Sequence, residues 1–156
     1  MNSSQLIPIL VAAATVYFLY ERTNDNTKIL SDEHRVVAEK LKVDITDLID
    51  IYYQRYLYPH EYPSYKLVIP ATRSEYRSDD RSINVVINDP ITGEIFYPNS
   101  IRQIAAHEAA HMLCRIKEEN DHGPLFVDTL QKLNAIGEEL GMYDSTLEID
   151  RRYKYD

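Results

Sequence analysis

Two histidines and a glutamate stand in the pattern H-E-x-x-H at residues 107–111, which read HEAAH. On a helix, His107 and His111 project from the same face, so both imidazoles can bind one tetrahedral zinc ion. Glu108 lies about 100° further round the helix, beside the metal. There it can take a proton from zinc-bound water and pass it to a leaving amine. The pattern therefore predicts a zinc site with Glu108 as general base.

A catalytic zinc ion needs a third protein ligand. Metzincins place that ligand six residues after the second histidine, where this chain has Lys117, so the metzincin class is excluded. Gluzincins take a glutamate from a following helix. Glu138 or Glu139 can serve in this role, and Glu118 or Glu119 less well.

His122 is the strongest candidate for the third ligand. It lies in the segment DHGPLF, where Gly123 can turn the chain and Pro124 suits the first position of a helix. A histidine at that turn can point back towards the HEAAH helix. Cys114 is a further candidate, although a small buried residue is its more common role.

The elements that must position these residues are two helices, expected over residues 100–118 and 124–140. Ser100 and Gln103 form the capping-box pattern S-x-x-Q at the start of the first helix. Small apolar residues flank the motif, so this helix is expected to be central and buried. Burying two histidines and a glutamate there without a shared partner is costly, which favours a bound metal.

The chain before residue 100 is expected to supply two more helices and a small sheet. Helical spacing favours helices over 32–42 and 44–57, and β-branched runs favour strands at 65–69, 82–87 and 94–97. The charged stretch 73–81 is interpreted as a loop or hairpin tip. The prediction is an α+β, minimal zincin-like domain over residues 31–156, with a mostly antiparallel sheet packed on the HExxH helix. His34 and His60 are interpreted as surface or packing residues, and the tail 151–156 as frayed.

HEAAH followed by DHGPLF resembles the SprT-like zinc metallopeptidases, small zincins in which a histidine before a phenylalanine-bearing helix follows the HExxH motif. The resemblance covers about residues 62–140. It implies His107, His111 and His122 as zinc ligands and Glu108 as general base. It also implies a strand, at 82–87 or 94–97, that lines a peptide cleft by edge pairing.

This chain departs from that family in its charge, at Leu125 and in a predicted membrane anchor, which is not part of the usual pattern. SprT-like proteases that act on DNA-linked proteins carry basic DNA-binding elements, whereas this chain has 17 basic against 25 acidic residues and a formal net charge of −8. No nucleic-acid partner is therefore expected. Leu125 stands where the HGPEF-type segments of related proteins carry glutamate. The single cysteine excludes an internal disulfide and a Cys₄ zinc finger.

An uncharged run at residues 6–20, LIPILVAAATVYFLY, is apolar on all sides of a helix. Counted from Asn2, it spans roughly 28 Å, the thickness of a hydrocarbon core. It predicts a single-pass membrane anchor over 1–21 that contacts lipid through residues 5–20, followed by a linker over 22–30. Arg22 and Lys28 favour a cytoplasmic C-terminal domain. A cleaved signal peptide and a helix docked on the domain are the alternatives.

Two functions follow from these features. The first is a membrane-anchored zinc metallopeptidase that hydrolyses a protein or peptide substrate. The alternative is a membrane-anchored scaffold in a larger assembly, for example a virus particle, that retains a zincin domain without turnover. A third reading is a soluble enzyme whose N-terminal helix docks on the domain.

Overall fold

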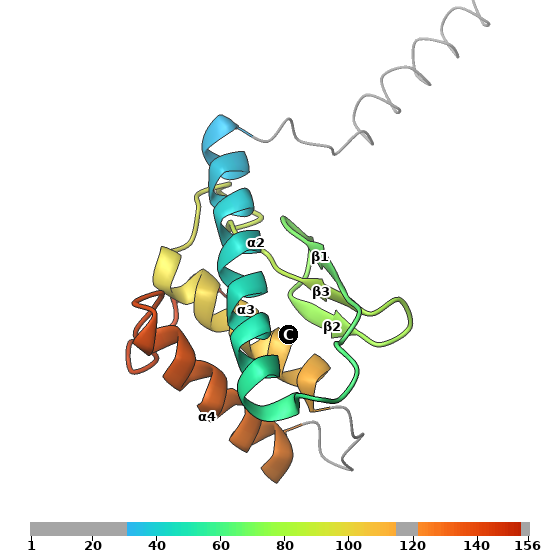
Figure 1. Cartoon of the computed structure of the whole chain (residues 1–156). Coiled ribbons are helices and arrows are strands. Elements are labelled where there is room, and N and C mark those ends of the chain that lie inside the picture. The colour runs from blue at the N-terminus through green and yellow to red at the C-terminus, as the bar shows by residue number, and fades with distance from the viewer. Residues whose placement is uncertain (1–30, 115–121, 154–156) are drawn as a thin grey trace, which may run out of the picture. The chain divides into compact units, whose positions relative to one another are not determined.

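The first described element, α2 (Asp32–Tyr52), is one long helix that continues into a π-helical turn, η1 (Tyr53–Leu57). The computed structural model describes residues 31–114 and 122–153 (Figure 1). Buried residues recur along α2 every three or four positions, so the helix turns one apolar stripe towards the core.

The predicted break between helices at residue 43 is wrong. Asp44 does not cap a second helix, because its carboxylate is paired with one side chain of the same helix and one from outside it. It accepts a hydrogen bond from Arg102 Nε at 2.7 Å and lies 3.4 Å from Lys40 Nζ. With this pairing, the backbone of α2 passes through the position without interruption.

Three short strands form one mixed sheet in the order β1-β3-β2. The central strand, β3 (Ser82–Asn84), pairs parallel with β1 (Lys66–Val68) and antiparallel with β2 (Glu75–Arg77). The expectation of a mostly antiparallel sheet is therefore wrong, since one of the two pairings is parallel.

Two strand assignments also need correction. The stretch 73–81, expected to be a loop, contains β2, in which Tyr76 stands opposite Ile83 of β3. The strand expected at 94–97 is reduced to an isolated bridge between Asn88 and Ile95, which closes a tight turn. Two backbone hydrogen bonds make this bridge, from Asp89 N to Glu94 O and from Phe96 N to Ile87 O, and a helix begins at Pro98, so the pairing extends no further.

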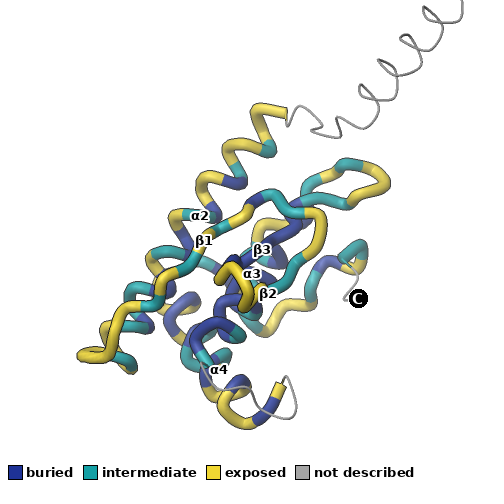
Figure 2. The backbone as a smooth tube through the Cα atoms, turned by 90° about the vertical axis from the view of Figure 1, so that its right-hand side faces the viewer, coloured by how far each residue is buried: buried dark blue, intermediate teal, exposed yellow. Residues whose placement is uncertain are grey.

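The helix that carries the HEAAH motif, α3 (Pro98–Leu113), packs on β2 and β3 and on α4 (Pro124–Glu139). Alanines at 105, 106, 109 and 110 are fully buried, and their small size lets neighbouring backbones approach α3 closely. Figure 2 shows α3 as a largely buried element beneath the sheet. The expectation of a central, buried helix is met.

The start of α3 is fixed by the C-terminal segment and not by a capping box. Tyr97 is the residue that caps the helix, without a side-chain hydrogen bond. Ser100 Oγ instead accepts a hydrogen bond from Asp150 N at 2.9 Å, and Gln103 Nε2 donates to the carbonyls of Asp144 and Leu147. The predicted capping box is wrong, because α3 begins at Pro98 and Ser100 therefore lies inside the helix, where its side chain and that of Gln103 bond to the C-terminal segment.

The segment after α4 is tied down as far as Tyr153, so the expectation of a frayed tail is wrong for residues 151–153. Asp150 is only 5% exposed, and its carboxylate accepts hydrogen bonds from Tyr97 N at 3.2 Å and from Arg152. Tyr153 packs edge-on against Phe96, with ring centroids 5.8 Å apart.

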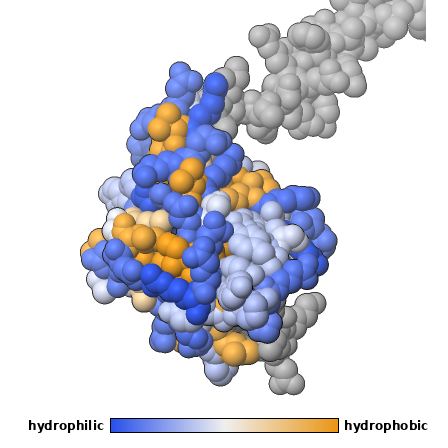
Figure 3. All heavy atoms as spheres, in the orientation of Figure 1, coloured by the Kyte–Doolittle hydropathy of each residue, from blue (hydrophilic) through white to orange (hydrophobic). Residues whose placement is uncertain are grey.

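No helix among the described residues is both long and apolar enough to cross a bilayer. For the part of the chain that the structure describes, the fold class is corrected to an α+β domain in which no transmembrane helix occurs, and the predicted single-pass localisation, in a membrane or a virion, is corrected with it. Of the described helices, α2 and α4 are apolar on one face only, whereas α3 is buried on most sides. Figure 3 shows apolar patches set among hydrophilic side chains. The run 6–20, the anchor over 1–21 and the linker over 22–30 lie outside the described residues.

Candidate metal centre

Three histidines from two parts of the chain point their ring nitrogens at one place. His107 and His111 lie one turn apart on α3, and His122 lies two residues before the start of α4. Their ligand atoms all lie within 4.8 Å of one another. The structure thus brings together the three residues expected to bind metal, and their binding of an ion stays a prediction.

The separations of these nitrogens can be compared with the geometry of a zinc site. His107 Nε2 lies 3.3 Å from His111 Nε2 and 3.2 Å from His122 Nε2. In a tetrahedral site with Zn–N bonds of about 2.05 Å, neighbouring nitrogens are about 3.3 Å apart. Both separations match the edge of such a tetrahedron, so the spacing of His107 from the other two imidazoles suits a zinc ion.

The charge state of His107 also suits a cation. Burial, together with the neighbouring His111 and His122, lowers the pKa of His107 to about 4. At neutral pH this imidazole is therefore uncharged and keeps a lone pair for a metal. His107 and His111 are partly buried and His122 is exposed, so the cluster is accessible from the side of His122.

The local chain explains why His122 reaches the cluster. Pro124 occupies the first turn of α4, where its missing N–H costs nothing, as expected. Gly123 precedes it in an extended conformation, with φ −67° and ψ −178°, which any residue can adopt. The glycine is therefore not needed for a special turn, contrary to expectation.

Glu108 is buried beside the histidines, only 6% exposed. Burial raises the pKa of its carboxyl group to about 7, opposed by a hydrogen bond from the backbone of Tyr76 and by the charge of Arg73. A carboxyl group with a pKa near the working pH can both accept and return a proton.

The strand beside Glu108 is β2, and sequence reasoning missed it. The strands expected to line a peptide cleft were 82–87 and 94–97. Within the first of these, β3 has neighbours on both sides, and the second forms only a single bridge. Strand β2 is an edge strand that packs on α3, and its Tyr76 backbone bonds to Glu108. This three-residue strand is too short to leave a clear alternation in the sequence.

The other candidate ligands are engaged elsewhere or lie apart. Glu138 accepts hydrogen bonds from Ser145, and Glu139 forms a paired contact with Arg55 at 2.7 and 2.8 Å. Cys114 is half-buried against the core and does not belong to the histidine group. Glu118 and Glu119 lie outside the described residues.

The two remaining histidines lie outside the cluster. His34 Nε2 lies 3.1 Å from the Gly93 carbonyl, a packing role in agreement with the prediction. His60 is exposed, and its carbonyl accepts a hydrogen bond from the Tyr53 hydroxyl.

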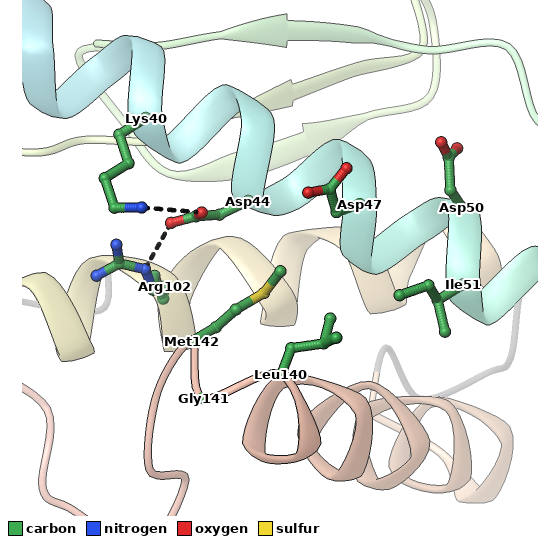
Figure 4. A pocket seen from close by; sticks show the side chains of 9 residues that line it. All are labelled: Lys40, Asp44, Asp47, Asp50, Ile51, Arg102, Leu140, Gly141 and Met142. Carbon is green, nitrogen blue, oxygen red and sulfur yellow. Dashed lines mark hydrogen bonds and ion pairs between the residues drawn. The ribbon is translucent and has the colours of Figure 1, made fainter.

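A separate surface pocket of about 560 Å³ shares no residue with the histidine cluster. Figure 4 shows it between α2, α3 and the chain that follows α4. Asp44, paired with Lys40 and Arg102, lies at one end, and Leu140 and Met142 form an apolar wall. The pocket contains both charge signs, so its lining selects no single class of ligand.

Comparisons with known proteins give no relative to set beside this geometry. No protein-family model matches the chain. No curated protein and no solved structure matches it. The functional argument therefore depends on the residues of the site alone.

Proposed function

We propose that this protein is a zinc-dependent metallopeptidase of the SprT-like type, which hydrolyses peptide bonds in a protein or peptide substrate. One observation carries the proposal: three Nε2 atoms converge at separations of 3.2 and 3.3 Å beside a buried glutamate. The H-E-x-x-H spacing, the third histidine after a short interval and the accessible side of the cluster all support it.

His107, His111 and His122 would hold the ion. Zinc, when bound there, supplies Lewis acidity that polarises a peptide carbonyl and acidifies water. Glu108 then removes a proton from the attacking water and delivers it to the nitrogen of the departing amine. Its burial suits this task, because a partly desolvated carboxylate is a stronger base than one in bulk water.

The substrate would lie along the free edge of β2. An extended peptide can add to a sheet edge through main-chain hydrogen bonds. The contact from the Tyr76 backbone to Glu108 puts this edge within reach of the proton-transfer group. Arg73 and Glu75 flank it with both charge signs, 4.0 Å apart, so the edge is suited to peptides without a strong charge bias.

The test compares the wild-type chain with Glu108→Gln, using metal analysis after dialysis and cleavage of a peptide library. Both proteins are expected to hold one zinc ion per chain, while the variant loses about 10²- to 10⁴-fold in turnover, the usual contribution of general acid–base catalysis. Glu138→Gln is the matched control, because that carboxylate contacts Ser145 and not the cluster. It should retain full activity.

Two results would overturn the proposal. A zinc-to-protein ratio near zero in folded wild-type protein removes the metal. Zinc bound in full, with no cleavage by the wild type and no difference in Glu108→Gln, identifies a non-catalytic scaffold instead.

A further inference from the structure

Phe126 contacts all three histidines of the candidate metal centre. Its ring centroid lies 4.9 Å from that of His107, 4.4 Å from His111 and 4.6 Å from His122. The three imidazole centroids are themselves 5.0 Å apart in each pair. The four rings therefore stand at the corners of a nearly regular tetrahedron, with the phenyl ring covering one face of the histidine triangle.

We propose that Phe126 is a positioning residue for the metal. It holds the three imidazole rings at the angles at which their Nε2 atoms converge, and thereby raises the affinity for zinc. This inference rests on the proposed function, since it requires that the histidines bind a metal.

The packing around Phe126 supports a role in orientation. The side chain is only 4% exposed, so it is held in place by the core and cannot swing away from the rings. A histidine that is fixed before the metal arrives loses less rotational freedom on binding, and pre-organised ligands bind more tightly. His107 and His111 are on α3 and Phe126 is on α4. The contact of the phenyl ring with the two imidazoles therefore also holds α3 and α4 in a fixed position relative to each other.

The electrostatics of the contact between Phe126 and the imidazoles are also relevant to metal binding. The phenyl face carries partial negative charge and attracts positively polarised groups. A cation draws electron density from the imidazoles that bind it, so the rings become more positive when the site is loaded. The contact with His111 is the closest and least tilted, at 36°, and the other two are closer to edge-on, at 67° and 69°. Where the phenyl face meets an imidazole, the contact gains strength as that imidazole becomes more positive.

The experiment measures zinc affinity by competition with a chromophoric chelator, and the visible spectrum of the Co²⁺-substituted protein. Phe126→Leu keeps an apolar side chain but loses the ring. It is expected to lower zinc affinity about 10- to 100-fold, the range typical of groups that orient metal ligands, and to change the Co²⁺ spectrum. Phe126→Tyr keeps the ring and should restore both readouts.

Leu133→Ala is the control for a general loss of core packing. Leu133 is fully buried two turns further along α4. This variant should lower thermal stability but leave zinc affinity and the Co²⁺ spectrum unchanged. If Phe126→Leu fails to fold, Phe126→Met takes its place as the ring-free variant.

The outcomes separate this inference from the proposed function. Wild-type protein that binds no zinc overturns both. Wild-type protein that binds zinc, with a ring-free variant whose affinity falls no further than that of Leu133→Ala, overturns only the role of Phe126, which is then an ordinary core residue.

Discussion

The two ends of α3 are held in opposite ways. At its start, unlike groups meet: the carboxylate of Asp150 accepts from backbone and guanidinium donors, and Asn99 and Gln103 bond to the chain around Asp144. Towards its other end, three like groups meet, and each presents a ring nitrogen to the same place. Pairs of donors and acceptors stabilise the fold by themselves. Converging nitrogen lone pairs stabilise the structure only when a cation binds between them. We therefore expect the function at the end of α3 that carries the histidines.

The largest effect should come from removing the metal. A ligand that binds only the folded state stabilises it by about 4 kcal/mol at a concentration a thousand times its dissociation constant. We expect zinc to raise the melting temperature of the wild-type chain and a chelator to lower it, as measured by calorimetry.

His122→Ala isolates this effect at one residue. The variant should lose the response to zinc while its metal-free melting temperature stays close to that of metal-free wild type, because His122 is exposed. An unchanged response to zinc in His122→Ala would show that the ion binds elsewhere.

The substitution Asp150→Asn tests the N-terminal end of α3. It removes a buried negative charge that accepts hydrogen bonds from Tyr97 and Arg152, so we expect a loss of about 2 kcal/mol in the free energy of unfolding. Zinc affinity should not change. A parallel loss of zinc affinity would contradict the independence of the two ends.

The pH dependence of this loss has a definite sign. The Arg152 guanidinium holds the pKa of Asp150 well below its usual range. The stability that the ionised Asp150 contributes is fully present above its unfolded pKa of about 3.9 and is lost as the pH falls towards the lower folded pKa. The difference between wild type and Asp150→Asn in urea unfolding should therefore narrow below about pH 4.

The smallest effect is expected from Ser100→Ala. This change removes the acceptor for the buried Asp150 N–H and should cost about 1 kcal/mol. Gln103→Ala gives the contrast with a capping box. A box predicts reciprocal contacts, and hence coupling between the two changes in a double-mutant cycle, whereas the separate contacts described above predict additivity.

Sequence reasoning succeeded where the interaction is local. His107 and His111 are one helical turn apart, Pro124 marks the start of α4, and His122 lies two residues before it, so their grouping followed from short intervals. It failed where the partner is distant. Arg102 is 58 residues from Asp44, and this ion pair removes the break that was expected in α2.

Local sequence patterns also could not predict the strand β2 or the role of Phe126. A three-residue strand has too few positions for alternation to stand out, and β2 forms only because β3 supplies the opposite ladder. Phe126 fits the apolar stripe of α4, and nothing in that spacing distinguishes a core residue from one that packs on three histidines. The membrane anchor was inferred from the apolar character of residues 6–20 alone, and no membrane-spanning helix occurs among the described residues.

The spacing between His122 and Phe126 limits which insertions and deletions this segment can accept. A single inserted or deleted residue turns the rest of a helix by about 100° and moves it by about 1.5 Å along its axis. Either change would carry the phenyl ring away from the imidazoles while leaving the histidine in place. The segment H-x-x-x-F should therefore tolerate replacement of its middle residues but not insertion or deletion. Together with H-E-x-x-H, it forms a pair of fixed-length signatures by which distant homologues of this chain can be sought.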